Sequence, residues 1–178
     1  MTEVHRTRRR LVHRQARARL SVLARDEFEG YASLFGVADS AGDVVAPGAF
    51  AQSLRARGVE RVRLLYQHFA HEPIGVWETI REDATGLYVK GRLLTDVERA
   101  RDVLALIRDG ALDGLSIGFR TRRARRDPAT GLRTLLEIEL WEISIVTFPL
   151  LPGSQVTAVG AKSGVAGEIR KAAEAMRS

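Results

Sequence analysis

The chain has 178 residues, 45% of them hydrophobic, which is enough for one domain with a proper core. It contains no cysteine, so disulfides, thiolate metal sites and a cysteine nucleophile are excluded. No apolar run approaches the roughly 20 residues of a membrane span, and the N-terminus lacks an apolar signal-peptide core, so we expect a soluble intracellular protein without a membrane partner.

The formal net charge of +6 is concentrated at the N-terminus. Residues 1–25 hold eight arginines and one acid, Glu3, a balance of +7 that leaves the remaining chain near neutral. Such an arm could touch nucleic acid or an acidic protein. We favour a solvated arm that is disordered or weakly helical, and nucleic acid is not expected as a partner.

After the arm, apolar residues alternate in short runs separated by turn-forming residues. These runs predict strands at 27–34, 61–66, 75–80 and 86–94, with turns at 39–43 and 81–85. A short helix is predicted at 49–57, with Phe50 and Leu54 on one face and Gly58 as its C-cap.

The clearest helix is predicted at 96–109. Its apolar stripe consists of Ala100, Val103, Leu104 and Ile107. Thr95 and Glu98 predict a capping box at its start, and Gly110 ends it.

The C-terminal third predicts a hairpin of strands 115–125 and 132–140 around the turn 127–131. Residues 141–148 are expected to continue as a buried strand, stopped by Pro149 and Pro152, and a short helix is expected at 167–176. We therefore expect a barrel-like α+β, β-rich domain over 26–158, between the arm 1–25 and a flexible or short helical tail, 159–178.

Three polar residues stand in settings that suit hydrolytic chemistry. Ser116 follows a glycine-bearing turn and points opposite to Leu115 and Ile117, so it faces a cleft if those two face the core. The pattern alone favours a serine on a solvent face, which is commonplace, since no G-x-S-x-G elbow is present. Glu142 lies in an apolar run, where a carboxylate needs either an arginine or histidine partner or a position on a solvent-exposed face of the strand.

His68 ends a predicted strand, where an imidazole could serve as a general base for a serine. His71 is close enough to compete for that role, and the two histidines could instead bind a metal. The metal alternative is disfavoured because the run follows a strand and precedes Pro73, so no metal or cofactor is expected. The five arginines within 120–126 could grip phosphates, but no aromatic residues are interleaved with them.

Taken together, five segments resemble the prohead (procapsid) maturation proteases of tailed bacteriophages. They are 43–50 (DVVAPGAF), 65–68 with 73–75 (LYQH and PIG), 86–91 (GLYVKG), 112–119 (LDGLSIGF) and 142–149 (EISIVTFP). The resemblance covers about residues 27–158 in order, which makes it more specific than any single segment. One departure is 149–152, where family members often read Pro-Ala-Asn after the proline-terminated strand.

The resemblance implies a β-barrel with a few peripheral helices, similar to herpesvirus assembly proteases. It implies that Ser116 is the nucleophile, His68 the general base and Glu142 the third member of a triad, with an oxyanion donor from Asp113-Gly114 or from the Gly118 region. The implied substrates are the scaffold segment of the major capsid protein and the protease itself, inside the assembling prohead in the host cytoplasm. A homo-oligomer is left open.

Two other functional classes stay open from the residues alone. The chain could be a non-catalytic capsid-assembly protein that keeps a protease-like fold. It could also be a nucleic-acid-binding module that uses residues 1–25 and the arginines at 120–126.

Overall fold

Residues 23–161, the part of the chain that this computed structural model describes, fold into eight strands, two α-helices and one 3-10 helix. The strands are β1 (Glu27–Leu34), β2 (Asp43–Val45), β3 (Arg63–Tyr66), β4 (Pro73–Glu82), β5 (Gly86–Leu93), β6 (Gly114–Arg126), β7 (Arg133–Val146) and β8 (Gln155–Val159). The helices are α1 (Ala51–Arg57), η1 (Val59–Arg61) and α2 (Glu98–Arg108). The predicted α+β, β-rich fold is confirmed.

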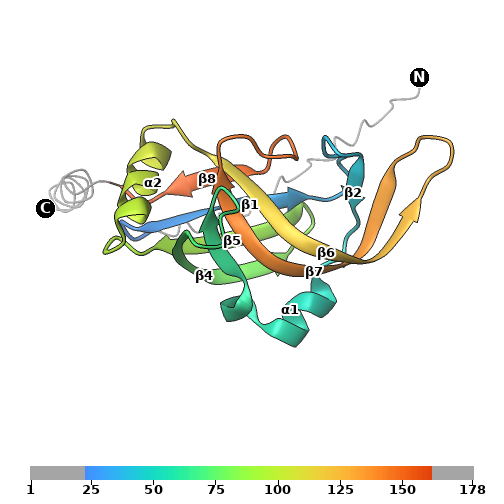
Figure 1. Ribbon diagram of the computed structural model, residues 1–178, viewed down its shortest axis with the longest axis horizontal. Helices are drawn as coiled ribbons and strands as arrows, with labels where there is room; N and C mark the ends of the chain where they lie inside the picture. Colours follow the sequence, from blue (N-terminus) through green and yellow to red (C-terminus); the bar gives the residue numbers. More distant parts are fainter. Residues whose placement is uncertain (1–22, 162–178) are drawn as a thin grey trace, which may run out of the picture.

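Seven of these strands close into a barrel. Neighbouring strands follow the order β7-β3-β4-β5-β1-β8-β6, and β6 pairs again with β7 to complete the ring. All pairings within the ring are antiparallel except β3 with β7, and β2 adds to β7 as a further parallel partner. Figure 1 shows both α-helices at the periphery of the barrel, with the end of the β6–β7 hairpin projecting on the side opposite α2.

Apolar side chains of alternating residues fill the barrel. On β5 the buried ones are Leu87, Val89 and Leu93. Gly91 leaves room for two rings, since a Cβ there would lie 2.8 Å from Trp77 and 2.9 Å from Phe28. These rings meet edge to face with centroids 5.5 Å apart, and the Trp77 indole donates to the Arg63 carbonyl at 3.3 Å. The core thereby fixes β3, the strand that leads to His68.

Both predicted helices in the described part are present with shorter bounds. All four stripe residues of α2 are buried, and Gly58 caps α1 with a φ of 76°. The predicted capping box at Thr95 is wrong, because the N-cap is Val97, which has no side-chain capping hydrogen bond. The Val97 amide donates to the Leu94 carbonyl at 2.8 Å, and after this turn the helix starts at Glu98, two residues later than predicted.

The strands β6 and β7 form the predicted hairpin, and β7 continues past residue 140 with residues 143–146 buried, as predicted, but the expected burial of Trp141 and Phe148 is wrong. Strand β7 runs without interruption from Arg133 to Val146. Trp141 is 47% exposed and Phe148, beyond the end of β7, is 88% exposed. Two short strands, β2 and β8, were not predicted, because they depend on pairing with β7 and β1 rather than on a local pattern.

The two ends of the described chain lie side by side. The Arg108 guanidinium donates to the carbonyls of Arg25, at 2.5 Å, and Gly160, at 3.1 Å. The first strand begins at Glu27 and the last ends at Val159. Most of the predicted basic arm and the helix predicted at 167–176 lie outside the described residues. Within residues 23–161, no helix has the length and apolar character needed to cross a membrane.

Candidate active site

Ser116 and Glu142 reach the same face of the β6–β7 hairpin through the strand register. Ser116 pairs with Ser144 across the two strands, and Gly118 pairs with Glu142. Residues two apart on a strand share a face, so these four positions form one patch. Leu115, on the opposite face of β6, is fully buried in the core, as expected for a serine that points away from it.

A bulge in β7 decides that Glu142 belongs to this face. Gly118 pairs with Glu142, whereas the next residue of β6, Phe119, pairs with Leu140, so Trp141 is an extra residue without a partner on β6. Leu140 points into the core before the bulge and Ile143 does so after it. The bulge therefore exchanges the inward and outward positions of β7, and without it Glu142 would point into the barrel.

The carboxylate of Glu142 lies directly over Gly118. A Cβ at Gly118 would lie 1.9 Å from Glu142 Oε1, a distance that no real contact allows. The group that approaches Gly118 this closely is a side chain and not a backbone. A glycine is needed at this position because the carboxylate occupies the space of its missing side chain.

His68 is held by a tight turn after β3. Gln67 and His68 both have positive φ values, 52° and 62°, in the left-handed region that residues other than glycine rarely adopt. The Gln67 amide donates to the Ile145 carbonyl at 3.0 Å, and its side chain donates to Thr147 Oγ1 at 2.7 Å. These bonds to the end of β7 hold the turn in its strained conformation.

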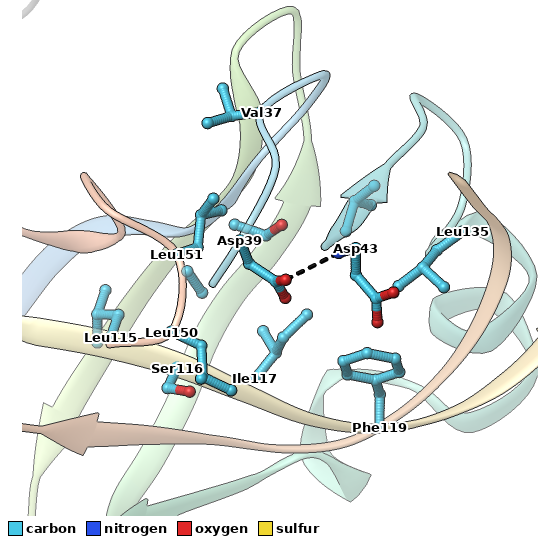
Figure 2. Close-up of a pocket in the computed structure, with 13 residues that line it drawn as sticks. Val37, Asp39, Asp43, Leu115, Ser116, Ile117, Phe119, Leu135, Leu150 and Leu151 are labelled. Atoms are coloured by element: carbon cyan, nitrogen blue, oxygen red, sulfur yellow. Dashed lines mark hydrogen bonds between the residues drawn. The ribbon is translucent and has the colours of Figure 1, made fainter. Parts of the chain in front are cut away.

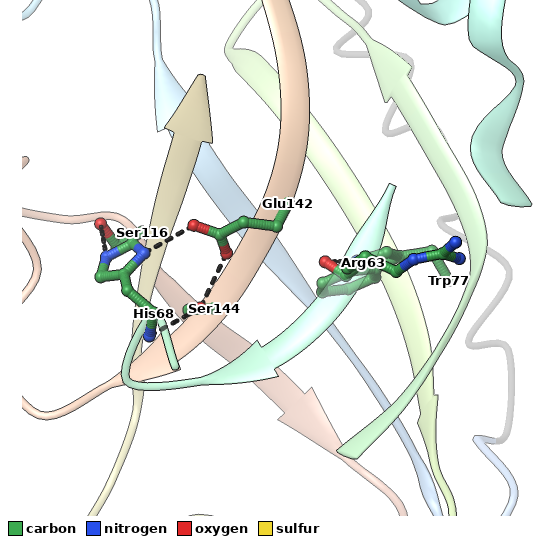
Figure 3. A network of polar contacts seen from close by, with 6 residues as sticks. All are labelled: Arg63, His68, Trp77, Ser116, Glu142 and Ser144. Carbon is green, nitrogen blue, oxygen red and sulfur yellow. Dashed lines mark hydrogen bonds and ion pairs between the residues drawn. The ribbon is translucent and has the colours of Figure 1, made fainter. Parts of the chain in front are cut away.

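The structure brings Ser116, His68 and Glu142 into one hydrogen-bonded chain (Figure 3). His68 Nε2 lies 3.0 Å from Ser116 Oγ, and His68 Nδ1 lies 2.6 Å from Glu142 Oε1. Since a carboxylate only accepts, Nδ1 carries the proton and Nε2 is left to accept the hydroxyl proton of Ser116. Ser116 is buried, whereas the His68 side chain is 42% exposed, so the site lies at the surface of the barrel.

Ser144 is a member of this network that the sequence reasoning missed. Its hydroxyl donates to Glu142 Oε2 at 2.7 Å and accepts the backbone amide of His68 at 3.0 Å. Ser144 is fully buried, so both bonds are shielded from water. The sequence did carry a signal for it, because Ser144 is a second polar residue in an otherwise apolar strand. It lies two residues after Glu142, and residues two apart on a strand share a face.

The electrostatics of the site favour a protonated imidazole. The hydrogen bond that His68 donates to Glu142 raises the pKa of His68 above its ordinary value of 6.5, with partial desolvation acting in the opposite direction and the charge of Glu142 adding to the increase. The arrangement therefore favours a positive charge on the His68 imidazole, next to the Ser116 hydroxyl.

His71 takes no part in the network. Its ring stacks on Phe69 with centroids 5.6 Å apart. Both ring nitrogens of His68 already have partners, so neither is free to ligate a metal together with His71. Within residues 23–161, no three His, Cys, Asp or Glu side chains gather in a way that could hold a metal ion.

Of the two predicted oxyanion donors, the Gly118 region is the poorer one. The carboxylate over Gly118 would repel a developing negative charge at that position. The amide of Leu115 is already bonded to the Ser154 carbonyl at 2.9 Å. The turn at Asp113-Gly114 stays the prediction for the oxyanion donor.

The arginines of the hairpin end are exposed, and some are neutralised locally. Arg122 pairs with Glu139, which also receives Arg57 at 3.0 Å, and Arg123 lies 3.9 Å from Glu137. This pairing leaves a smaller positive surface than the sequence indicates. It adds no observation in favour of nucleic-acid binding.

Comparison with known proteins places this geometry in context. The sequence model of Peptidase_S78, described as caudovirus prohead serine protease, matches residues 15–166. The prohead protease of Enterobacteria phage HK97 is 36% identical over 140 residues, which make up 78% of this chain and 62% of that protein. The chain thus spans about three fifths of the length of this curated relative.

Two solved structures resemble the barrel. The bacteriophage T4 capsid assembly protease aligns with a TM-score of 0.57 at 14% identity, over 69% of this chain and 82% of that chain. The KSHV protease aligns with a TM-score of 0.49 at 12% identity, over 73% of this chain and 63% of that chain. The T4 alignment shows a shared fold. The match to the Peptidase_S78 model, over residues 15–166, covers far more than half of the chain. The protein therefore belongs to the Peptidase_S78 family of caudovirus prohead serine proteases.

Proposed function

We propose that the protein is a serine endopeptidase of capsid maturation, with Ser116 as nucleophile, His68 as general base and Glu142 as the acid that orients His68. The observation that carries this proposal is the hydrogen-bonded chain from Ser116 Oγ through both nitrogens of His68 to Glu142, with distances of 3.0 and 2.6 Å. Membership of a protease family supports the peptidase class.

In this mechanism Ser116 Oγ attacks the carbonyl carbon of the scissile peptide bond while His68 Nε2 takes the hydroxyl proton. The tetrahedral intermediate then collapses, the carbon–nitrogen bond breaks, and His68 returns the proton to the departing amine. Water attacks the acyl-enzyme, again losing a proton to His68, and the acid product leaves as Ser116 regains its hydrogen. Glu142 stays ionised and stabilises the imidazolium in both halves of the reaction.

Ser144 has a positioning role in this scheme, because it touches no reacting atom. The Ser144 hydroxyl donates to Glu142 Oε2 and accepts the backbone amide of His68. These two bonds hold the proposed base and acid in place relative to each other. Such support keeps the imidazole aligned with the nucleophile, and misplacement by about 1 Å costs roughly a hundredfold in rate.

The proposed substrates are the scaffold segment of the major capsid protein and the protease itself, cleaved inside the assembling prohead in the host cytoplasm. The names of the similar proteins, a prohead protease and a capsid assembly protease, support this assignment. The non-catalytic assembly protein is the competing function, and it predicts that Ser116 can be replaced without effect on processing.

The test is intact-mass analysis of the chain co-expressed with its cognate major capsid protein, for wild type and for Ser116→Ala. We expect trimmed capsid protein in the first sample and full-length capsid protein in the second. Equal trimming in both samples would exclude Ser116 as the nucleophile. Full-length protein in both samples, with shells still assembled, would favour the assembly protein.

A further inference from the structure

The loop between β3 and β4 holds the proposed general base in a backbone conformation that its own residues do not favour. Gln67 and His68 have positive φ values, and within residues 23–161 no other residue except glycine does. Such residues persist only where the surrounding structure over-determines them. The amides of Gln67 and His68 provide part of this support through their bonds to Ile145 and Ser144 on β7.

The second half of this loop is bonded to itself. The Phe69 amide donates to the Tyr66 carbonyl at 3.0 Å, and the Glu72 amide donates to the Phe69 carbonyl at 2.9 Å. The Tyr66 amide donates in turn to the Glu72 carbonyl at 3.1 Å, so the two ends of the loop lie side by side. These backbone bonds set the shape of the loop, but they do not join it to another part of the barrel.

Arg99, in the first turn of α2, contacts both ends of the loop. Its Nε donates to Glu72 Oε2 at 3.1 Å, which is a charge-assisted hydrogen bond. Its guanidinium carbon lies 5.1 Å from the centroid of the Tyr66 ring, which is a cation–π contact. Tyr66 is the last residue of β3 and stands two residues before His68, so Arg99 supports the loop where the chain turns toward the proposed base.

Helix α2 is also connected to the proposed nucleophile. Strand β6, which carries Ser116, follows α2 directly in the order of elements. The Ala111 amide donates to the Leu106 carbonyl at 2.9 Å and holds the connection between them against the helix. The buried apolar stripe packs α2 into the barrel. Helix α2 is therefore joined to Ser116 through the chain and to the loop of His68 through Arg99.

The walls of the pocket beside Ser116 do not include Arg99. This pocket encloses about 410 Å³, part of it open to solvent, between the β1–β2 loop and the β7–β8 loop (Figure 2). Ile117 and Leu150 are among its lining residues, and neither Arg99 nor the loop 67–72 contributes to it. Loss of the Arg99 side chain therefore leaves the lining of this pocket unchanged.

We propose that Arg99 is a positioning residue, which holds the loop 67–72 from α2 so that His68 stays aligned between Ser116 and Glu142. The inference rests on the proposed function and adds a residue that controls the geometry of its base. An isolated surface ion pair contributes little, but Arg99 contacts both ends of one strained loop. Without Arg99 the loop populates conformations in which the imidazole is misaligned, and the rate of proton transfer falls.

The test measures kcat and KM of the full-length chain on a mapped cleavage peptide for Arg99→Ala. Arg101→Ala is the matched control, because Arg101 lies in the same turn of α2 and carries the same charge, but donates to the Thr95 carbonyl at 3.0 Å. Glu72→Gln completes a double-mutant cycle with Arg99→Ala. The rate at which a fluorophosphonate labels Ser116 reports the alignment of the base without a peptide substrate.

We expect Arg99→Ala to lower kcat by about threefold to tenfold with KM within about twofold of wild type, and to slow the labelling of Ser116 by a similar factor. Arg101→Ala should stay within about twofold of wild type in both measurements. In the Glu72→Gln background, Arg99→Ala should cost less than it does alone.

Three results would overturn the inference and leave the proposed function standing. They are an unchanged kcat and labelling rate in Arg99→Ala, a change confined to KM, and equal losses in Arg99→Ala and Arg101→Ala. Cleavage of the peptide by Ser116→Ala at the wild-type rate would overturn both the proposed function and the inference.

Discussion

Replacing Gly118 by alanine tests whether the position of Glu142 controls catalysis. The new methyl group would lie 1.9 Å from Glu142 Oε1 and 2.6 Å from its carboxyl carbon. Ordinary contacts begin near 3.4 Å, so the carboxylate must retreat by about 1.5 Å. Gly118 is not among the residues with positive φ, so its backbone accepts alanine without strain. The change therefore acts on one side chain.

The expected loss follows from the hydrogen bonds that this retreat breaks. Glu142 is held at 2.6 Å from His68 Nδ1 and at 2.7 Å from Ser144 Oγ, and a displacement of about 1.5 Å removes one or both bonds. A misplacement of about 1 Å costs roughly 10²-fold, and complete loss of a triad acid costs about 10⁴-fold. We expect kcat/KM to fall by about 10² to 10⁴, or about 2.7 to 5.4 kcal/mol.

The assay is kcat/KM on a mapped cleavage peptide, measured in a double-mutant cycle with Glu142→Ala. If Gly118 matters only through the carboxylate, Gly118→Ala should cost almost nothing once Glu142 is removed. Circular dichroism and thermal unfolding check that the barrel persists. Activity of Gly118→Ala within about threefold of wild type would refute the reasoning, as would equal losses with and without Glu142.

Three further variants test other bonds of the site and the fold. Ser144→Ala leaves the His68 amide unpaired, so kcat/KM should fall about tenfold and the free energy of unfolding by about 1 to 2 kcal/mol in denaturant titrations; no change in either would contradict its positioning role. Glu142→Gln should move the acid limb of the pH profile of kcat/KM to lower pH, because Glu142 raises the pKa of His68; a stationary limb would assign that limb to another group. The raised pKa of His68 also stabilises the folded wild type relative to Glu142→Gln below pH 6.5. This difference in the free energy of unfolding should vanish as pH rises through the folded-state pKa of His68, and denaturant titrations at about pH 5 and about pH 9 measure it. Arg108→Ala should lower the free energy of unfolding by about 1 kcal/mol with activity unchanged, since it releases the carbonyls of Arg25 and Gly160, which make no bond to Ser116, His68 or Glu142; a loss of activity would show coupling to the site.

Elements with a strong local pattern could be predicted from the sequence. The strand at 27–34 and the helix stripe that begins at Ala100 depend on residues close together in the chain, and both are present. The same holds for Gly58, where a helix end needs a residue that adopts positive φ. The family resemblance singled out Ser116, His68 and Glu142 by motif, and the fold places them within hydrogen-bonding distance.

The bulge at Trp141 could not be predicted, and it is the feature that makes the site. Nothing local distinguishes Trp141 from a core residue, so the sequence indicated a buried strand from 141 onward. The bulge exists because β6 and β7 change register between Gly118 and Phe119, which is a property of two strands together. Sequence periodicity sees one strand at a time, and it therefore misses the exchange of faces that brings Glu142 to His68.

The turn that holds His68 was hidden for a similar reason. Two consecutive residues with positive φ and no glycine carry no turn signal of their own. The turn is stabilised from outside, by Gln67 on Thr147 and by the His68 amide on Ser144. These contacts join segments about 80 residues apart, so they become visible only in the folded protein.

The most direct measurement of the central claim is covalent labelling by a serine-reactive fluorophosphonate, followed by intact-mass analysis and peptide mapping. The account predicts one adduct on Ser116 of the wild-type chain. It predicts none in Ser116→Ala, and much slower labelling in His68→Ala and Glu142→Gln, because the hydroxyl then lacks its oriented base. An adduct on another residue, or labelling of Ser116 at an equal rate in all His68 and Glu142 variants, would contradict a catalytic triad at this site.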